Sequence, residues 1–312
     1  MPYIKEGKVA IIGAGFVGST AAYALLIGNI PSEIALIDVH KEKAEGEALD
    51  LRHSMQFTSP VKIEFGNDLK LCKDAEIIVI TVGAHQNPGE TRLDLVQKNA
   101  AIFKPLISNI AKYNKDCIII VVSNPLDVLT YLTLKYSKFK PNRVFGSGTI
   151  LDTARFRYLL GEYFCVDPSS IHAYILGEHG DSEFPVWSTA NIAGVHLSKL
   201  KGYNKNRLDE IFKKTKNAAY EIIAKKGATY YAIGLGIAKI VRAILRDHNE
   251  VLPVSSLLKN YNGVSDVCLS VPCVINRNGI KQQLILPLDN KEKEDLKKSA
   301  DIIKNYIRKV GD

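Results

Sequence analysis

The chain has 312 residues, 46% of them apolar and 24% charged, which is the composition of a globular protein with one large core or two smaller ones. Its net charge of +8 comes from lysines spread over many segments, which argues against nucleic-acid binding and is explained more simply by small anionic ligands. The five cysteines lack metal-ligand spacing, which predicts reduced, buried thiols and no metal site. The first residues do not resemble a signal peptide, and no apolar run approaches the ~18 residues of a membrane span. We therefore expect a cytoplasmic protein.

Short β-branched runs alternate with helix-length segments in the first half of the chain. They predict strands at residues 9–12, 34–37, 77–82 and 118–122, with helices between them that include residues 19–26 and 93–113. Strands that are apolar on both faces and are joined through helices form a parallel sheet with right-handed crossovers. Residues 1–145 are therefore predicted to form a Rossmann domain, which is a doubly wound α/β nucleotide-binding fold.

The pattern changes near Gly146. A long helix, a strand that ends in a glycine-rich turn, and mixed helices and strands follow as far as Ile275, and residues 289–308 have the pattern of a lysine-rich amphipathic helix. Residues 146–312 are therefore predicted to form a second, mixed α+β domain that binds the substrate.

A glycine motif, Gly13-Ala14-Gly15-Phe16-Val17-Gly18, follows the first strand directly and opens a helix. In that context the first glycine permits a tight turn, Gly15 lets a diphosphate approach the backbone, and Gly18 allows the helix to pack closely on the strand. Asp38 ends the next strand, where a carboxylate accepts hydrogen bonds from ribose hydroxyls and repels a 2′-phosphate. The motif therefore predicts NAD, rather than NADP, as the cofactor.

Further motifs follow in order along the chain. They are Pro-Gly-Glu-Thr-Arg-Leu-Asp-Leu at residues 88–95, Val-Ser-Asn-Pro at 122–125, Leu-Asp-Thr-Ala-Arg-Phe-Arg at 151–157 and Gly-Glu-His-Gly-Asp-Ser at 177–182. Together with the glycine motif they resemble the lactate and malate dehydrogenase superfamily. The whole chain is similar to its bacterial L-lactate dehydrogenases, and this resemblance implies a reversible hydride transfer between NADH and pyruvate that gives L-lactate and NAD.

The resemblance also implies the catalytic roles. His179 is implied to be the general acid and base, which suits a side chain whose ordinary pKa of about 6.5 lies near the working pH. Asp152 orients the imidazole and should raise its pKa. Arg155, three residues later on the same helix face, binds the substrate carboxylate with its planar guanidinium. Arg92 is the loop arginine that closes over the substrate and polarises its carbonyl.

Other residues are implied to line the pocket. Asn124 resembles the asparagine that contacts the substrate and the nicotinamide, with a simple turn cap as the alternative. Thr229 and Ile233 are predicted to share one face of a helical stretch at residues 227–233, with Thr229 near the substrate methyl group and Ile233 against the nicotinamide, although core packing is a rival explanation for Ile233. The predicted cofactor-binding residues are Gly13, Gly15, Phe16, Val17, Gly18, Asp38, Gly83, Ala84, Val122, Asn124 and Ile233.

Gln86 is the residue that implies pyruvate rather than oxaloacetate. Malate dehydrogenases of the superfamily carry an arginine at this position, which pairs with a second carboxylate. A neutral glutamine accommodates a methyl group and leaves a second carboxylate unpaired. Malate or another 2-hydroxy acid remains the alternative substrate. A non-catalytic nucleotide-binding or nucleic-acid-binding Rossmann protein is the alternative from another class.

Arg157 and His172 match basic residues that allosteric bacterial members use to hold fructose 1,6-bisphosphate between subunits. Residues two apart on a helix point about 200° from each other, so Arg157 should face away from the substrate side that Arg155 addresses. The resemblance therefore implies a homotetramer that the bisphosphate activates. An exposed arginine and an ordinary strand histidine are the alternative interpretation of the pair.

Overall fold

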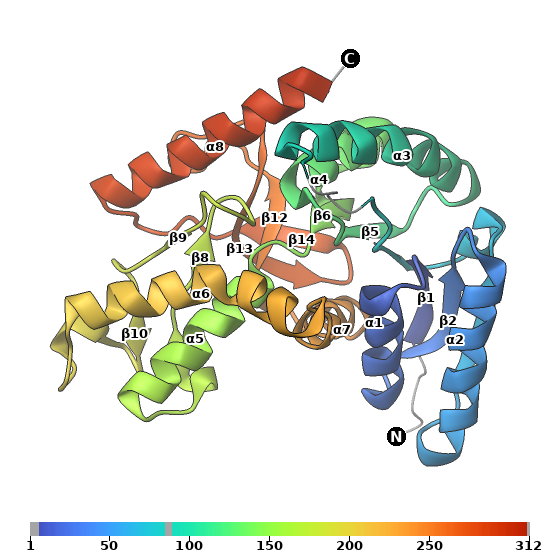
Figure 1. The fold of residues 1–312 in the computed structure, drawn as a ribbon, viewed down its shortest axis with the longest axis horizontal. Coiled ribbons are helices and arrows are strands. Elements are labelled where there is room, and N and C mark those ends of the chain that lie inside the picture. The colour runs from blue at the N-terminus through green and yellow to red at the C-terminus, as the bar shows by residue number, and fades with distance from the viewer. Residues whose placement is uncertain (1–5, 85–88, 311–312) are drawn as a thin grey trace.

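A nine-stranded sheet runs through the centre of the computed structural model, which describes residues 6–84 and 89–310 (Figure 1). The strands lie in the order β14-β13-β12-β6-β5-β4-β1-β2-β3. Their bounds are β1 Glu6–Ile12, β2 Pro31–Ile37, β3 Lys62–Gly66, β4 Ile77–Ile80, β5 Ile118–Val121, β6 Val144–Gly146, β12 Glu250–Leu257, β13 Cys268–Asn276 and β14 Gly279–Gln283. Strands β1 to β6 pair in parallel, whereas β12 to β14 pair antiparallel.

Helices cover the sheet. They are α1 Phe16–Ile27, α2 Lys41–His53, α3 Arg92–Tyr113, α4 Leu126–Ser137, α5 Ile150–Phe164, α6 Lys205–Lys226, α7 Tyr231–Leu245 and α8 Asn290–Val310. Helices α3, α4 and α8 contact one another. Helix α7 contacts α1 and α5, and α5 also contacts α6. Figure 1 shows the first group at the top of the view and α5, α6 and α7 at the bottom.

The predicted parallel sheet is confirmed. The predicted strands correspond to β1, β2, β4 and β5, although β4 ends at Ile80 and β5 at Val121, short of the predicted ends. Every residue of β4 and β5 is buried, because helices cover both faces of the sheet. Strand β3 and helix α2, which had no prediction of their own, complete the unit beyond β2.

The sheet continues into the second half of the chain. Strand β12 pairs with β6 at Ser255 and Gly146, so the predicted boundary at residues 145 and 146 falls within a strand of the shared sheet. Strands β12 and β13 are buried over most of their length, which explains why they join the large core. A separate small core forms around Phe156, Ile171 and Leu208, between α5, α6 and the short strand β7 Ile171–His172.

Four of the five cysteines are buried, as predicted, and burial raises the pKa of Cys72, Cys117 and Cys273 to about 12. The prediction was wrong for Cys165, which is exposed. It ends α5 in the left-handed region, at φ +55°, where the chain turns away from the core. Among the residues that the structure describes, no helix combines the length and the apolar character needed to cross a membrane.

Candidate active site

The glycine turn between β1 and α1 lies so close to the sheet that two of its positions have no room for a side chain. A Cβ atom on Gly18 would lie 1.8 Å from the carbonyl oxygen of Gly13. A Cβ atom on Gly13, where φ is +109°, would lie 2.6 Å from Oγ1 of Thr81, whose hydroxyl donates to the carbonyl of Gly13 at 3.0 Å. These contacts are the physical reason for glycine at both positions.

The space above Gly15 is open by contrast. Gly15 is the N-cap of α1, and the nearest atom to a Cβ placed on it would be Nζ of Lys43, at 3.9 Å. A helix N-terminus beside an ammonium group, with room at the backbone, fits a diphosphate. Lys43 lies on α2, outside the glycine motif, and the sequence pattern did not single it out.

Asp38 fixes the glycine turn from the end of β2. Its Oδ2 accepts a hydrogen bond from the backbone N–H of Ala14 at 2.8 Å, and its Oδ1 accepts one from His40 at 3.0 Å. The carboxylate that the sequence predicts to bind the ribose therefore positions the backbone of the glycine turn. Phe16, also predicted to bind the cofactor, is 68% exposed and stacks on Tyr230 with 5.1 Å between ring centroids.

Asn99 joins the ends of β4 and β5. It is fully buried on α3, and its Oδ1 accepts a hydrogen bond from the backbone N–H of Ala84 at 2.7 Å. Its Nδ2 donates to the carbonyl of Asn124 at 2.9 Å and to that of Ala84 at 3.3 Å. One amide therefore ties together two predicted cofactor-binding segments. The available signal was an asparagine on the apolar face of α3, at helical spacing from Val96 and Phe103.

His179, Asp152 and Arg155 lie together, as predicted. His179 Nδ1 is 2.6 Å from Oδ2 of Asp152, and Arg155 Nη1 is 3.0 Å from Oδ1 of the same carboxylate. Burial disfavours the charged form of Asp152, but the two cationic partners outweigh it and hold its pKa below the ordinary value. Burial likewise opposes protonation of His179, but Asp152 raises its pKa to about 9. Both oxygens of Asp152 are thus engaged by cationic groups.

The loop that carries His179 is held through its backbone. The N–H of His179 donates to Oδ2 of Asp127 at 2.8 Å, and Oδ1 of Asp127 accepts from Ser255 at 2.6 Å. Burial raises the pKa of Asp127 to about 7, although both of these hydrogen bonds favour its ionised form. The N–H of Glu178 donates to Oγ of Ser299 on α8 at 2.7 Å. The sequence predicted none of these three side chains, because Asp127 and Ser299 act on backbone groups and Ser255 acts on Asp127.

Arg92 begins α3, where Thr91 and Asp94 form a capping box. Its guanidinium forms an ion pair with Glu178, which is almost completely buried, and another with Asp181 at 3.0 Å. Arg92 is therefore attached to the residues on either side of the His179–Gly180 pair.

Two predictions concern residues near the expected pocket. Gln86 lies outside the described residues. The helix predicted over residues 227–233 was wrong, because α6 ends at Lys226 and α7 begins at Tyr231. Gly227, at φ +83°, donates its N–H to the carbonyl of Ile223 and ends α6. Thr229 therefore lies in the connection and shares no helix face with Ile233, which is buried on α7 in the main core.

Arg157 and Arg155 have different partners on α5. Nε of Arg157 donates to the carbonyl of Ala173 at 2.9 Å, and its guanidinium lies over the ring of Tyr174, 4.8 Å from the centroid. His172 is exposed and precedes Ala173 on the chain. The two predicted effector residues thus lie on the neighbouring elements α5 and β7, and neither takes part in the contact between Arg155 and Asp152.

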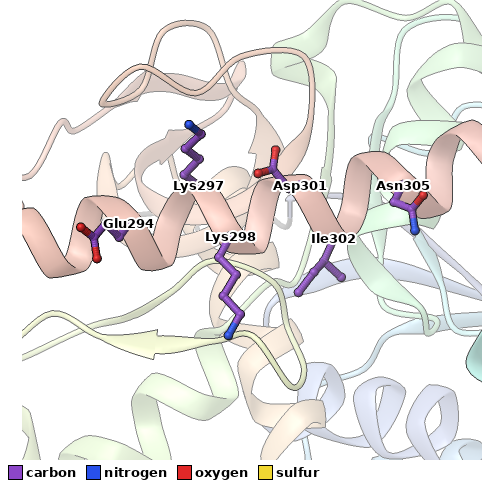
Figure 2. A pocket seen from close by; sticks show the side chains of 6 residues that line it. All are labelled: Glu294, Lys297, Lys298, Asp301, Ile302 and Asn305. Carbon is purple, nitrogen blue, oxygen red and sulfur yellow. The ribbon is translucent and has the colours of Figure 1, made fainter.

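A hollow on the surface follows α8, far along the chain from the predicted site. Figure 2 shows its lining residues, all on this one helix: Glu294, Lys297, Lys298, Asp301, Ile302 and Asn305. Acidic and basic side chains are mixed there, as is usual on a solvated helix face, and no predicted site residue is among them.

The match to known proteins covers both halves of the chain. Residues 7–146 match the NAD-binding domain of the lactate/malate dehydrogenase family, and residues 149–312 match the α/β C-terminal domain of that family. The chain therefore belongs to the lactate/malate dehydrogenase family.

Individual relatives narrow the assignment. The chain is 51% identical over 306 residues to the L-lactate dehydrogenase of Acetivibrio thermocellus, with 96% of each chain covered. It is 48% identical over 311 residues to L-lactate dehydrogenase 1 of Clostridium acetobutylicum, with 98% of this chain and 99% of that one covered. The crystal structure of the minor L-lactate dehydrogenase from Enterococcus mundtii, in a ligand-bound form, matches with a TM-score of 0.95 at 42% identity over 98% of both chains. Within the family, the chain groups with the NAD-dependent L-lactate dehydrogenases of bacteria.

The role of Asn99 can be tested with Asn99→Asp. An aspartate keeps the acceptor for Ala84 but loses the N–H groups that bind two carbonyls, and leaving buried polar groups unpaired costs roughly 1–3 kcal/mol each. We expect NADH affinity to fall at least about tenfold, as measured by fluorescence titration. Asn109→Asp on the same helix, which keeps the acceptor for Lys112, is the control. Unchanged NADH affinity in an Asn99→Asp protein that merely unfolds at a lower temperature would show that Asn99 serves stability alone.

Proposed function

We propose that this dehydrogenase reduces pyruvate to L-lactate, and oxidises L-lactate in reverse, through His179, Asp152 and Arg155. The observation that carries the proposal is the pair of contacts that Asp152 makes, to His179 on one oxygen and to Arg155 on the other. They hold a proton donor and a carboxylate-binding cation side by side, which is what reduction of a 2-oxo acid requires.

The proton chemistry follows from the tautomer that this geometry selects. Because Nδ1 of His179 faces Asp152, Nε2 is left to exchange a proton with the substrate oxygen. NADH, when bound, supplies the hydride for the carbon atom. Asp152 remains ionised and stabilises the imidazolium until its proton is transferred.

Arg155 and Arg92 complete the proposed site. Arg155 uses one N–H group on Asp152, and its remaining N–H groups are available for the substrate carboxylate. Arg92 is held by Glu178, next to His179, and in this proposal stabilises the charge that develops on the carbonyl oxygen. Asn124 and Thr229 are assigned to substrate contacts.

Residues 1–145 are assigned as the NAD-binding domain and residues 146–312 as the substrate-binding domain, which adds Ile233 to the cofactor contacts. The tight turn at Gly13 and Gly18, the open N-terminus of α1 and the anchored carboxylate of Asp38 all fit a dinucleotide. The other proposed contacts are Phe16, Val17, Gly83, Ala84, Val122 and Ile233.

We also propose regulation by fructose 1,6-bisphosphate in a homotetramer. Arg157 contacts Ala173 and Tyr174, and His172, which precedes Ala173 in the chain, is exposed. In this proposal both side chains bind an anion that bridges two copies of the chain. Exposed apolar residues such as Leu235 and Tyr231 on α7, 60% and 67% exposed, are consistent with subunit contacts.

Gln86→Arg tests the choice of substrate. The new arginine can pair with the second carboxylate of oxaloacetate, whereas pyruvate gains nothing. We expect the ratio of kcat/KM for oxaloacetate to that for pyruvate to rise on the order of a thousandfold. Gln282→Arg, which adds the same charge on the exposed face of β14, is the control and should leave the ratio unchanged. An unchanged ratio in Gln86→Arg would refute the assignment of Gln86.

The pH dependence tests His179. A pKa raised to about 9 keeps the imidazole protonated at neutral pH, so pyruvate reduction should be favoured there and should fall as the pH rises through about 9. Lactate oxidation needs the neutral imidazole and should rise over the same range. His179→Asn should lower turnover in both directions on the order of 10²–10⁴-fold with little change in NADH affinity. His248→Asn, at an exposed turn, is the control, and equal losses in the two variants would exclude His179 as the acid and base.

The effector site is tested by pyruvate saturation curves with and without fructose 1,6-bisphosphate. In the wild type we expect the bisphosphate to lower the half-saturating pyruvate concentration by about 5–150-fold. Arg157→Gln combined with His172→Gln should abolish this response, whereas Arg207→Gln on exposed α6 should retain it. Identical wild-type curves in both conditions would refute the allosteric proposal and leave the catalytic one standing.

A further inference from the structure

Glu183 is a buried acid in the site that the chemistry described above does not use. It lies four residues after His179, just before the short strand β9 Phe184–Pro185, and is only 7% exposed. Its Oε1 is buried and has no hydrogen-bond partner in the part of the chain that the structure describes. One donor atom each of Glu183, Asp152 and His179 lie within 4.8 Å of one another. The carboxyl group therefore belongs to the cluster that is proposed to bind the substrate.

The groups around Glu183 set its charge. Burial is the main influence and raises the pKa of Glu183 to about 8, and the negative charge of Asp152 acts in the same direction. The positive charges of His179, Lys216 and Arg155 oppose this shift without cancelling it. Lys216 is directed elsewhere by its hydrogen bond to the carbonyl of Asp181.

Resting on the proposed function, we infer that Glu183 is a second acid of this site and that a carboxylate substrate binds only while Glu183 keeps its proton. The reason is the balance of charge in a buried cluster. Protonated His179 and Arg155 carry two positive charges, and Asp152 carries one negative charge. A bound carboxylate neutralises the remainder, whereas ionised Glu183 would leave an uncompensated negative charge.

The substrate and Glu183 also compete for the same cation. Arg155 favours the ionised form of Glu183, and it is the residue proposed to bind the substrate carboxylate. When the substrate carboxylate binds Arg155, Arg155 stabilises ionised Glu183 less, and the substrate carboxylate also brings another negative charge close to Glu183. Glu183 must then take up a proton when the substrate binds at alkaline pH.

The first measurement is the thermal stability of the wild type and Glu183→Gln from pH 5 to pH 9, which needs no catalytic activity. A Glu183 whose pKa is higher in the folded chain than in the unfolded chain binds more protons when folded between about pH 4.5 and pH 8. The wild type should therefore lose stability across that interval, relative to a variant that cannot titrate. We expect the advantage in Tm of Glu183→Gln to grow from pH 5 to pH 8 and then to level off.

The second measurement is the affinity for oxamate, an unreactive carboxylate analogue of pyruvate, at several pH values above neutrality in the presence of NADH. Binding to the wild type needs a proton on His179 and one on Glu183, so proton uptake should approach roughly two per oxamate at alkaline pH. In Glu183→Gln it should be roughly one. Glu210→Gln, an exposed carboxylate on α6, is the matched control and should behave like the wild type.

The outcomes separate the two proposals. A stability difference that does not vary with pH, or equal proton uptake in the wild type and Glu183→Gln, would overturn the role of Glu183 while the dehydrogenase assignment stands. If Glu183→Gln does not fold, Glu183→Met, of similar volume and unable to titrate, repeats both comparisons. A wild type that reduces no pyruvate at any pH would refute the proposed function, and the stability comparison would still report whether Glu183 holds a proton.

Discussion

The contact between His179 and Asp152 is the constraint that organises the site, since it fixes a loop histidine against a helix carboxylate with a separation of 2.6 Å. A buried carboxylate is stable in its ionised form only beside cationic partners, and removing one partner of a buried pair costs roughly 3–5 kcal/mol. Arg155 supplies the second partner at 3.0 Å. The residue proposed to bind the substrate thus also stabilises the residue that orients the proposed acid.

Holding that contact requires support from both halves of the chain. Asp127 on α4 fixes the backbone of His179 and is itself bonded to Ser255 on β12, whereas Ser299 on α8 fixes Glu178. Strand β12 lies next to β6, at the junction of the parallel and antiparallel parts of the sheet. The continuous sheet therefore places the supports of one loop in a common frame.

Sequence patterns predicted the features that arise from local chemistry. Buried β-branched runs marked the parallel strands, and the glycines marked a turn in which Cβ atoms do not fit. Asn99 and Asp127 escaped prediction because they bind backbone groups that only the fold brings near them. The helix expected at Thr229 is absent because the left-handed conformation of Gly227 ends α6 at Lys226.

Three buried carboxyl groups near His179 show how partners, rather than burial alone, decide where charge lies. Asp152 faces two cationic groups and its pKa is lowered, whereas Asp127 accepts only neutral N–H and O–H donors and its pKa is raised to about 7. Glu183 has an unpaired oxygen, and its pKa is raised to about 8. Below about pH 7 the negative charge of these three groups is therefore concentrated on Asp152, where it holds the proton on His179. The net positive charge that remains at Arg155 and His179 is complementary to one carboxylate.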